Sequence, residues 1–119
     1  MNIDSEISRL HFENFLWFLF IILSCLNIYG DYDEELFLEK HNVYYKRESH
    51  AIFTFTIMIT LFIYLYFFIR NYKAYELASE REKRLYSIKL LGSAFFILGV
   101  LCLLYFQLYE KSFVGSPLI

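Results

Sequence analysis

The stretch Ser49–Ile69 reads SHAIFTFTIMITLFIYLYFFI and contains no Asp, Glu, Lys or Arg. At 1.5 Å per residue, a helix of this length crosses the hydrocarbon core of a bilayer, which is about 30 Å thick. Two more uncharged apolar stretches, Asn14–Gly30 and Leu90–Tyr109, lie on either side of it in the chain. The sequence therefore predicts an integral membrane protein with three transmembrane helices.

The composition supports a membrane protein over a soluble one. Hydrophobic residues make up 58% of the chain and aromatic residues 22%, so a soluble fold would expose large apolar patches. Backbone groups in lipid must pair internally, and the alternating pattern of a membrane barrel is missing. We expect an all-α fold in which residues 1–119 form one three-helix unit, with spans at about 12–29, 51–69 and 90–109.

The first span invites comparison with a cleaved secretory signal, and Ile22–Cys25 partly matches a lipoprotein signal box. A signal peptide needs a positively charged leader. Here the leader has one basic residue, Arg9, against three acidic residues, and Leu23 suits the lipoprotein box poorly. We therefore expect the first helix to be retained.

The distribution of Lys and Arg predicts the orientation. The leader carries one basic residue, the segment 31–48 three, the segment 70–89 six and the tail one. Basic loops stay in the cytoplasm. We therefore expect a multi-pass protein of a bacterial plasma membrane, with a cytoplasmic N-terminus and an external C-terminus. The second and third helices would form a hairpin that projects into the cytoplasm.

Local signals predict where the first helix starts and ends. Apolar residues recur at helical spacing in the leader, and Asp4 or Ser5 is a suitable N-cap. The helix is expected to run to about Tyr29 and to stop at Gly30, because glycine favours the end of a helix. A separate short helix from about Asp33 to His41 would follow.

The second connection lacks Gly and Pro, so the flanking helices extend beyond the membrane. Ser79 and Glu82 have the spacing of a capping box, which predicts that the third helix starts at Glu80. The second helix would end between Tyr72 and Ala78. The third helix would run to about Glu110.

The three apolar stretches contain no charged residue, which disfavours a transporter, proton relay or ion channel. Their polar residues are of the kind that hydrogen-bond between helices or back to the backbone. We expect them to hold the helices together and not to line a permeation path. They are Ser24, Asn27, Thr54, Thr56, Thr60, Ser93 and Gln107.

An acidic cluster follows the first span and has the composition of half a calcium site. It fails the EF-hand pattern, because Leu36 stands where the loop needs Gly and Asn42 where it needs Glu. A solvated run that starts a helix is the better interpretation. The cluster is also a possible contact for a basic partner, through Asp31, Asp33, Glu34 and Glu35.

No metal or cofactor site is predicted. His41 and His50 are nine residues apart without a neighbouring Cys, and His11 lies at the other face of the membrane, so neither zinc nor haem is supported. Cys25 and Cys102 lie at similar depth, which permits a disulfide. We expect them to be small packing residues instead.

The third span carries the clearest packing signal. Gly92 and Gly99 are seven residues apart and so share one helix face, with Cys102 nearby. Small residues let helices approach closely in lipid. The neighbour would be another helix of the chain, a second copy or a different protein.

These observations favour a non-catalytic protein, an accessory or assembly subunit of a larger membrane complex, because intramembrane polar machinery is missing. One alternative is an immunity protein against a membrane-active toxin. If the toxin is a cationic peptide, the acidic cluster would be its contact. Another is a holin-like pore, although the threonines do not share one face. An enzyme is disfavoured because no base can reach a nucleophile. Nucleic-acid binding has no support. Lipid is expected as a partner, together with a membrane protein or a second copy.

Overall fold

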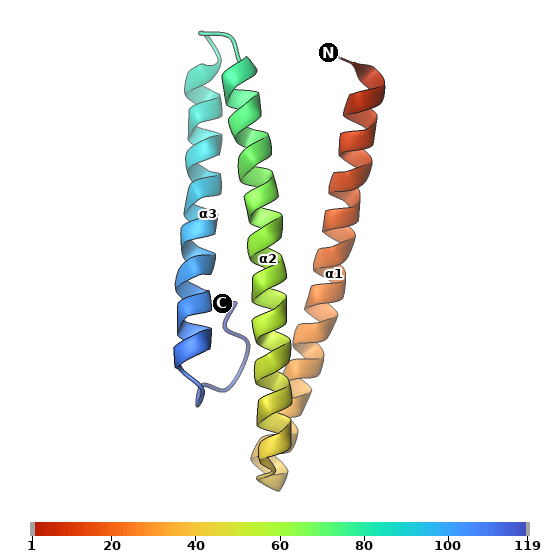
Figure 1. Ribbon diagram of the computed structural model, residues 1–119, viewed down its shortest axis with the longest axis vertical. Helices are drawn as coiled ribbons and strands as arrows, with labels where there is room; N and C mark the ends of the chain where they lie inside the picture. The colour runs from red at the N-terminus through yellow and green to blue at the C-terminus, as the bar shows by residue number, and fades with distance from the viewer. Residues whose placement is uncertain (1, 119) are drawn as a thin grey trace.

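A computed structural model describes residues 2–118 and confirms the all-α membrane fold (Figure 1). This part of the chain forms three helices, α1 (Ile3–Lys40), α2 (Val43–Leu77) and α3 (Lys83–Tyr109). Each helix is long and apolar enough to cross a membrane. The chain is therefore built as a multi-pass membrane protein.

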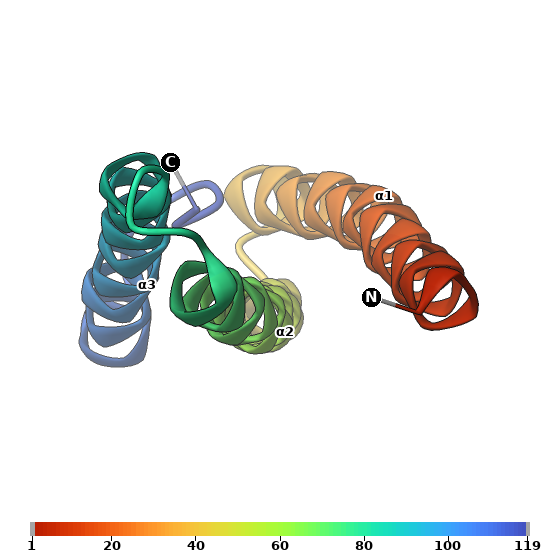
Figure 2. The ribbon, with the colours of Figure 1, turned by 90° about the horizontal axis from the view of Figure 1, so that it is seen from above.

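α2 lies in the middle, with α1 against one side and α3 against the other (Figures 1 and 2). Among the described residues, α1 and α3 do not contact each other. The Cα positions extend over 60 × 27 × 14 Å, so the molecule is a layer only one helix thick. One face of α2 is buried between its two neighbours, whereas the opposite face, which carries Phe55, Phe62 and Ile69, is exposed.

The start of α1 differs from the sequence prediction. The N-cap is Asn2, whose side-chain Oδ1 accepts from the backbone N–H groups of Asp4 and Ser5, at 2.9 and 3.5 Å. Asp4 and Ser5 thus lie within the first turn, where the Asp4 carboxylate also suits the helix dipole. The predicted caps were two to three residues too late.

The predicted stop at Gly30 is wrong, and so is the separate helix from Asp33 to His41. α1 continues without a break to Lys40 and ends where His41 adopts the left-handed conformation, with φ of 55°. Gly30 instead lets α2 approach closely, because an added Cβ would lie 2.6 Å from the Phe53 ring. A glycine in the interior of a helix costs only about 1 kcal/mol relative to alanine, which is not enough to end the helix.

Two short turns connect the helices. Asn42 begins α2, and its side chain accepts from the backbone N–H of Tyr44. The predicted helical hairpin of α2 and α3 is confirmed, and α2 ends at Leu77 within the expected range. The predicted capping box is wrong, because α3 begins at Lys83 and no side chain caps it. Ser79 accepts hydrogen bonds through its backbone carbonyl and not through its side chain.

The buried apolar core is small, as expected of a flat molecule in lipid. Leu16, Leu23 and Ile63 form its centre between α1 and α2. Most other large apolar side chains are exposed, where hydrocarbon would surround them. After α3 the chain turns back toward the bundle, and Pro117 is buried there (Figure 1).

Candidate functional site

A polar network holds the helices together at the end of the bundle that carries the α2–α3 turn. Arg70 Nη1 donates to Glu13 Oε1 at 2.8 Å and so joins α2 to α1. The Tyr66 hydroxyl donates to the other oxygen of Glu13 at 3.2 Å, and Arg9 lies 3.8 Å from that same oxygen. Glu13 is only 6% exposed, and its carboxylate is compensated by partners on both α1 and α2.

The same network extends to α3. The Arg70 guanidinium donates through Nε and Nη2 to Asn71 Oδ1, at 3.3 and 2.9 Å. Asn71 Nδ2 in turn donates to Ser93 Oγ. All three helices are therefore linked by a continuous chain of hydrogen bonds, which lies at the ends of the first two predicted spans.

A second ion pair lies at the opposite end of the bundle, near the α1–α2 turn. Lys46 Nζ lies 2.8 Å from Glu34 Oε1, and Ser49 Oγ donates to the same oxygen at 3.0 Å. Lys46 also donates to the backbone carbonyl of Phe113, at 2.6 Å. One ammonium group thus ties α1, α2 and the C-terminal segment together.

A pair of carboxyl groups lies beside this ion pair, beyond the end of the first span. Asp33 is 2% exposed, and its Oδ2 has no hydrogen-bond partner within residues 2–118. Burial, and then the neighbouring Glu48, raise the pKa of Asp33 to about 6. The nearby hydroxyls of Tyr44 and Tyr29 lower the pKa of Glu48. Asp33 therefore holds its proton more tightly than Glu48.

The predicted role of the polar residues inside the spans is confirmed for most of them. Gln107 Nε2 donates to the His50 carbonyl and to Thr54 Oγ1, both at 3.2 Å, which joins α3 to α2. Thr56 Oγ1 donates to Asn27 Oδ1 at 2.9 Å, which joins α2 to α1. These hydroxyl and amide groups are satisfied by the chain itself.

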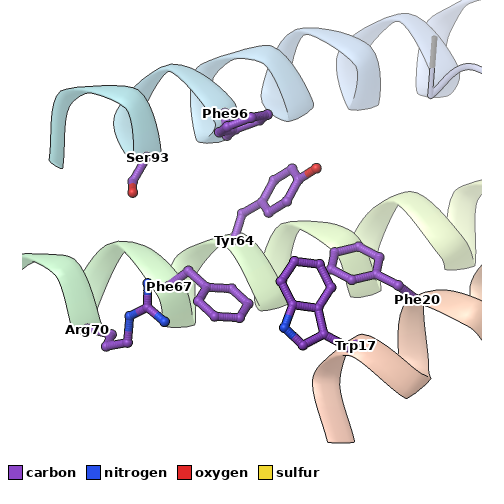
Figure 3. A pocket seen from close by; sticks show the side chains of 7 residues that line it. All are labelled: Trp17, Phe20, Tyr64, Phe67, Arg70, Ser93 and Phe96. Carbon is purple, nitrogen blue, oxygen red and sulfur yellow. The ribbon is translucent and has the colours of Figure 1, made fainter. Parts of the chain in front are cut away.

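An aromatic pocket of about 490 Å³ lies over α2, between α1 and α3. Figure 3 shows side chains from all three helices around it, with Tyr64 between the Phe20 and Phe96 rings. The Tyr64 ring centroid is 6.1 Å from that of Phe20 and 5.3 Å from that of Phe96. Arg70 and Ser93 form its polar end. The lining residues are Trp17, Phe20, Tyr64, Phe67, Arg70, Ser93 and Phe96.

The acidic cluster predicted as a partner contact is divided by the fold. Asp31 and Glu35 are exposed, whereas Asp33 and Glu34 are buried against α2. A helix turns 100° per residue, so consecutive residues of a cluster face different sides. Only Asp31 and Glu35 are therefore available to a partner.

The small residues of α3 lie on a surface that no other part of the described chain covers. A Cβ added at Gly92 or at Gly99 would meet nothing within 4 Å, and Cys102 is exposed. Cys25 and Cys102 are free thiols on the two helices that do not touch each other. The close approach within the chain is made by Gly30, which the sequence pattern predicts to be a helix stop.

No group of three or more potential metal ligands occurs within residues 2–118. Sequence reasoning missed the two ion pairs, although one signal was present. Glu13 directly precedes the first span and Arg70 directly follows the second. Because consecutive spans are antiparallel, these two residues lie at the same depth.

Comparison of the chain with protein-family models, with curated proteins and with solved structures finds no match. Its function must therefore be inferred from its own residues and their arrangement.

Proposed function

We propose that this protein is a non-catalytic membrane subunit that binds another membrane protein through α3, as an accessory or assembly factor of a larger complex. The observation that carries the proposal is the uncovered surface of α3. Among the described helices, α3 packs on α2 alone, and Val100 and Gln107 are its only buried residues among those described. Its small residues, Gly92, Gly99 and Cys102, are available to a partner helix.

The way in which helices associate in lipid explains how this surface can bind a partner. Lipid tails are as apolar as leucine, so helices associate in a membrane through close van der Waals contact and hydrogen bonds. The hydrogen-bonding groups of α3 named above, Ser93 and Gln107, are already used toward α2. Close backbone approach at Gly92 and Gly99 is the means of binding that we propose.

The proposal is tested by gentle purification from the native host, followed by native mass spectrometry. We expect a defined complex with another membrane protein, and loss of that complex in Gly99→Leu. Leu98→Phe adds bulk at the adjacent exposed position, which faces another direction, and serves as the matched control. A bare monomer or a homo-oligomer would contradict the subunit role.

The orientation belongs to the same proposal. The α2–α3 turn and its flanks carry six basic residues, so we place this end in the cytoplasm and the C-terminus outside, in a bacterial plasma membrane. Tags at the two termini, probed with protease in intact and in opened cells, check this assignment. An N-terminal tag that is cleaved in intact cells would overturn it.

An immunity role is the second candidate, and the exposed Asp31 and Glu35 favour it. Both lie at the end of the bundle opposite the basic turn, where a cationic toxin would arrive from outside. Protection of sensitive cells against a toxin encoded by a neighbouring gene, lost in the Asp31→Asn/Glu35→Gln variant, would support this role. A pore is less favoured, because Thr56 and Thr60 are buried and hydrogen-bonded within the chain.

A further inference from the structure

The aromatic pocket has the properties of a ligand site with two chemically different ends. Its volume of about 490 Å³ lies in the range of small-molecule sites, which are mostly apolar with a few placed polar groups. The rings of Trp17 and Phe96 at its edges are 59% and 62% exposed, so the pocket opens to the surrounding lipid. Its polar end is formed by Arg70 and Ser93 (Figure 3).

Arg70 has hydrogen-bonding capacity left over. A guanidinium carries five N–H donors, and Arg70 uses three of them toward Glu13 and Asn71. Its carbon Cζ lies 4.8 Å from the centroid of Phe67, so the charged group sits directly at the aromatic wall. Two N–H donors remain for an anionic oxygen.

The charge at this end favours an anion. Lys73 lies one turn beyond Arg70 on α2, and Lys89 lies one turn before Ser93 on α3. Glu13 is the carboxylate that faces Arg70, and Arg9 on α1 pairs with Glu6 at 2.9 Å. The surplus positive charge therefore comes from Lys73 and Lys89. The basic residues thus outnumber the acidic ones at the boundary where phospholipid headgroups lie.

We propose that this pocket binds one anionic phospholipid, with an acyl chain along the aromatic wall and the phosphate at Arg70. The apolar part suits a hydrocarbon chain, the pocket is open sideways to the bilayer, and Arg70 lies directly after the second span, at headgroup depth. A peptide or a second copy would have to present both an apolar segment and a free anion at this depth.

The chain has a single tryptophan, Trp17, which lines the pocket, so all tryptophan fluorescence of the protein arises at this site. Because Trp17 also faces the surrounding lipid, the signal for a bound lipid is the difference in quenching between two lipids. The experiment compares the quenching of Trp17 by phosphatidylglycerol and by phosphatidylcholine, each brominated on its acyl chains, in vesicles at equal mole fraction. We expect a preference of about fivefold for phosphatidylglycerol, the ratio that one basic contact at a membrane surface supplies. Quenching by phosphatidylglycerol should saturate at low mole fraction.

The Glu13→Gln/Arg70→Gln double variant removes the cation without leaving a buried charge unpaired, and we expect it to abolish the preference. Arg47→Gln removes one cation at the opposite end of the bundle and should retain the preference. Equal quenching by both lipids in the native protein would overturn the site, and that result needs no variant. Absence of quenching would also overturn the site, because no lipid chain would then reach Trp17. A preference that persists in the double variant would overturn the role of Arg70.

Discussion

At the scale of single residues, one glycine determines how closely α1 and α2 pack. A Cβ at Gly30 would lie 2.6 and 2.8 Å from two ring atoms of Phe53, a residue that is only 2% exposed. The same addition at Gly99 would meet nothing within 4 Å. The two glycines therefore have different roles although both lie in apolar helices.

We expect Gly30→Ala to destabilise the protein. Overpacking costs about 1–3 kcal/mol, which exceeds the gain of about 0.5–1 kcal/mol from replacing a helical glycine. Denaturation in micelles, followed by circular dichroism, measures the effect. Gly99→Ala is the matched control and should leave stability unchanged or slightly raised. Equal behaviour of the two variants would contradict the packing of Gly30.

Lys46 is the only cation that lies against Glu34 in an ion pair within residues 2–118. Lys46→Met should cost roughly 3 kcal/mol, the low end for breaking a buried pair, because it leaves the nearly inaccessible Glu34 carboxylate uncompensated. The same denaturation assay applies. Arg47→Met, at the exposed neighbour, should change stability by less than about 0.5 kcal/mol. Adding Glu34→Gln to Lys46→Met should restore part of the loss.

The raised pKa of Asp33 predicts that the stability of the protein depends on pH. Its pKa is about 6 in the folded protein and 3.8 in its unperturbed state, so folding takes up a proton between these values. Stability should therefore rise as pH falls from 7 to 5. The lowered pKa of Glu48 acts in the opposite sense, but only at pH values below 4.5, its ordinary value.

Melting temperatures at pH 7 and pH 5 test this expectation. The native protein should be more stable at pH 5, and Asp33→Asn should reduce that difference. All other titratable groups are present in both proteins, so the comparison removes their contribution. Asp31→Asn, at an exposed site, should keep the native difference. The same pH response in all three proteins would exclude Asp33 as its source.

At the scale of elements, α2 is the helix on which the other two are assembled. It bonds to α1 through Glu13, Asn27 and Glu34, and to α3 through Ser93 and Gln107. The N-terminal turns of α1, by contrast, diverge from α2 and are mostly exposed (Figure 1). Local stability should differ accordingly.

Hydrogen exchange measures that difference. We expect amides of Ile3–His11 in α1 to exchange faster than those of Val43–His50 in α2, although both segments are helical and mostly outside the predicted spans. The second segment is held by Lys46 and Ser49, whereas the first has few contacts with other helices. Mass spectrometry in nanodiscs would resolve both peptides. Equal protection would contradict the open position of the start of α1.

At the scale of the whole molecule, the long axis of 60 Å is about twice the thickness of a hydrocarbon core. α1 and α2 continue beyond the membrane together, because α1 runs ten residues past Gly30, or about 15 Å. The α1–α2 hairpin should therefore stand clear of the bilayer.

Cysteine labelling tests this protrusion. In a background with Cys25→Ser and Cys102→Ser, a membrane-impermeant maleimide should label Lys40→Cys in opened membranes. Phe55→Cys, at a lipid-facing position that is 54% exposed in the protein, should stay unlabelled. Protection of Lys40→Cys would place the hairpin within the membrane and contradict the extension.

The three spans, the α2–α3 hairpin and the end of α3 near Glu110 followed from the sequence. Hydropathy adds up along consecutive residues, so it is readable without knowledge of any neighbour. The polar residues of the spans were also recognised as groups that join helices, because lipid leaves them no other partner.

Tertiary structure decided the rest. Gly30 lies in the interior of a helix and does not end it. Its role is to let the Phe53 ring of another helix pack closely. Asp33 and Glu34 are buried while Asp31 and Glu35 are exposed, because the rotation of α1 against α2 selects which carboxylates face inward. The aromatic pocket exists because α1 and α3 lie apart on α2. Such features depend on the relative depth and rotation of separate helices, which no local pattern encodes.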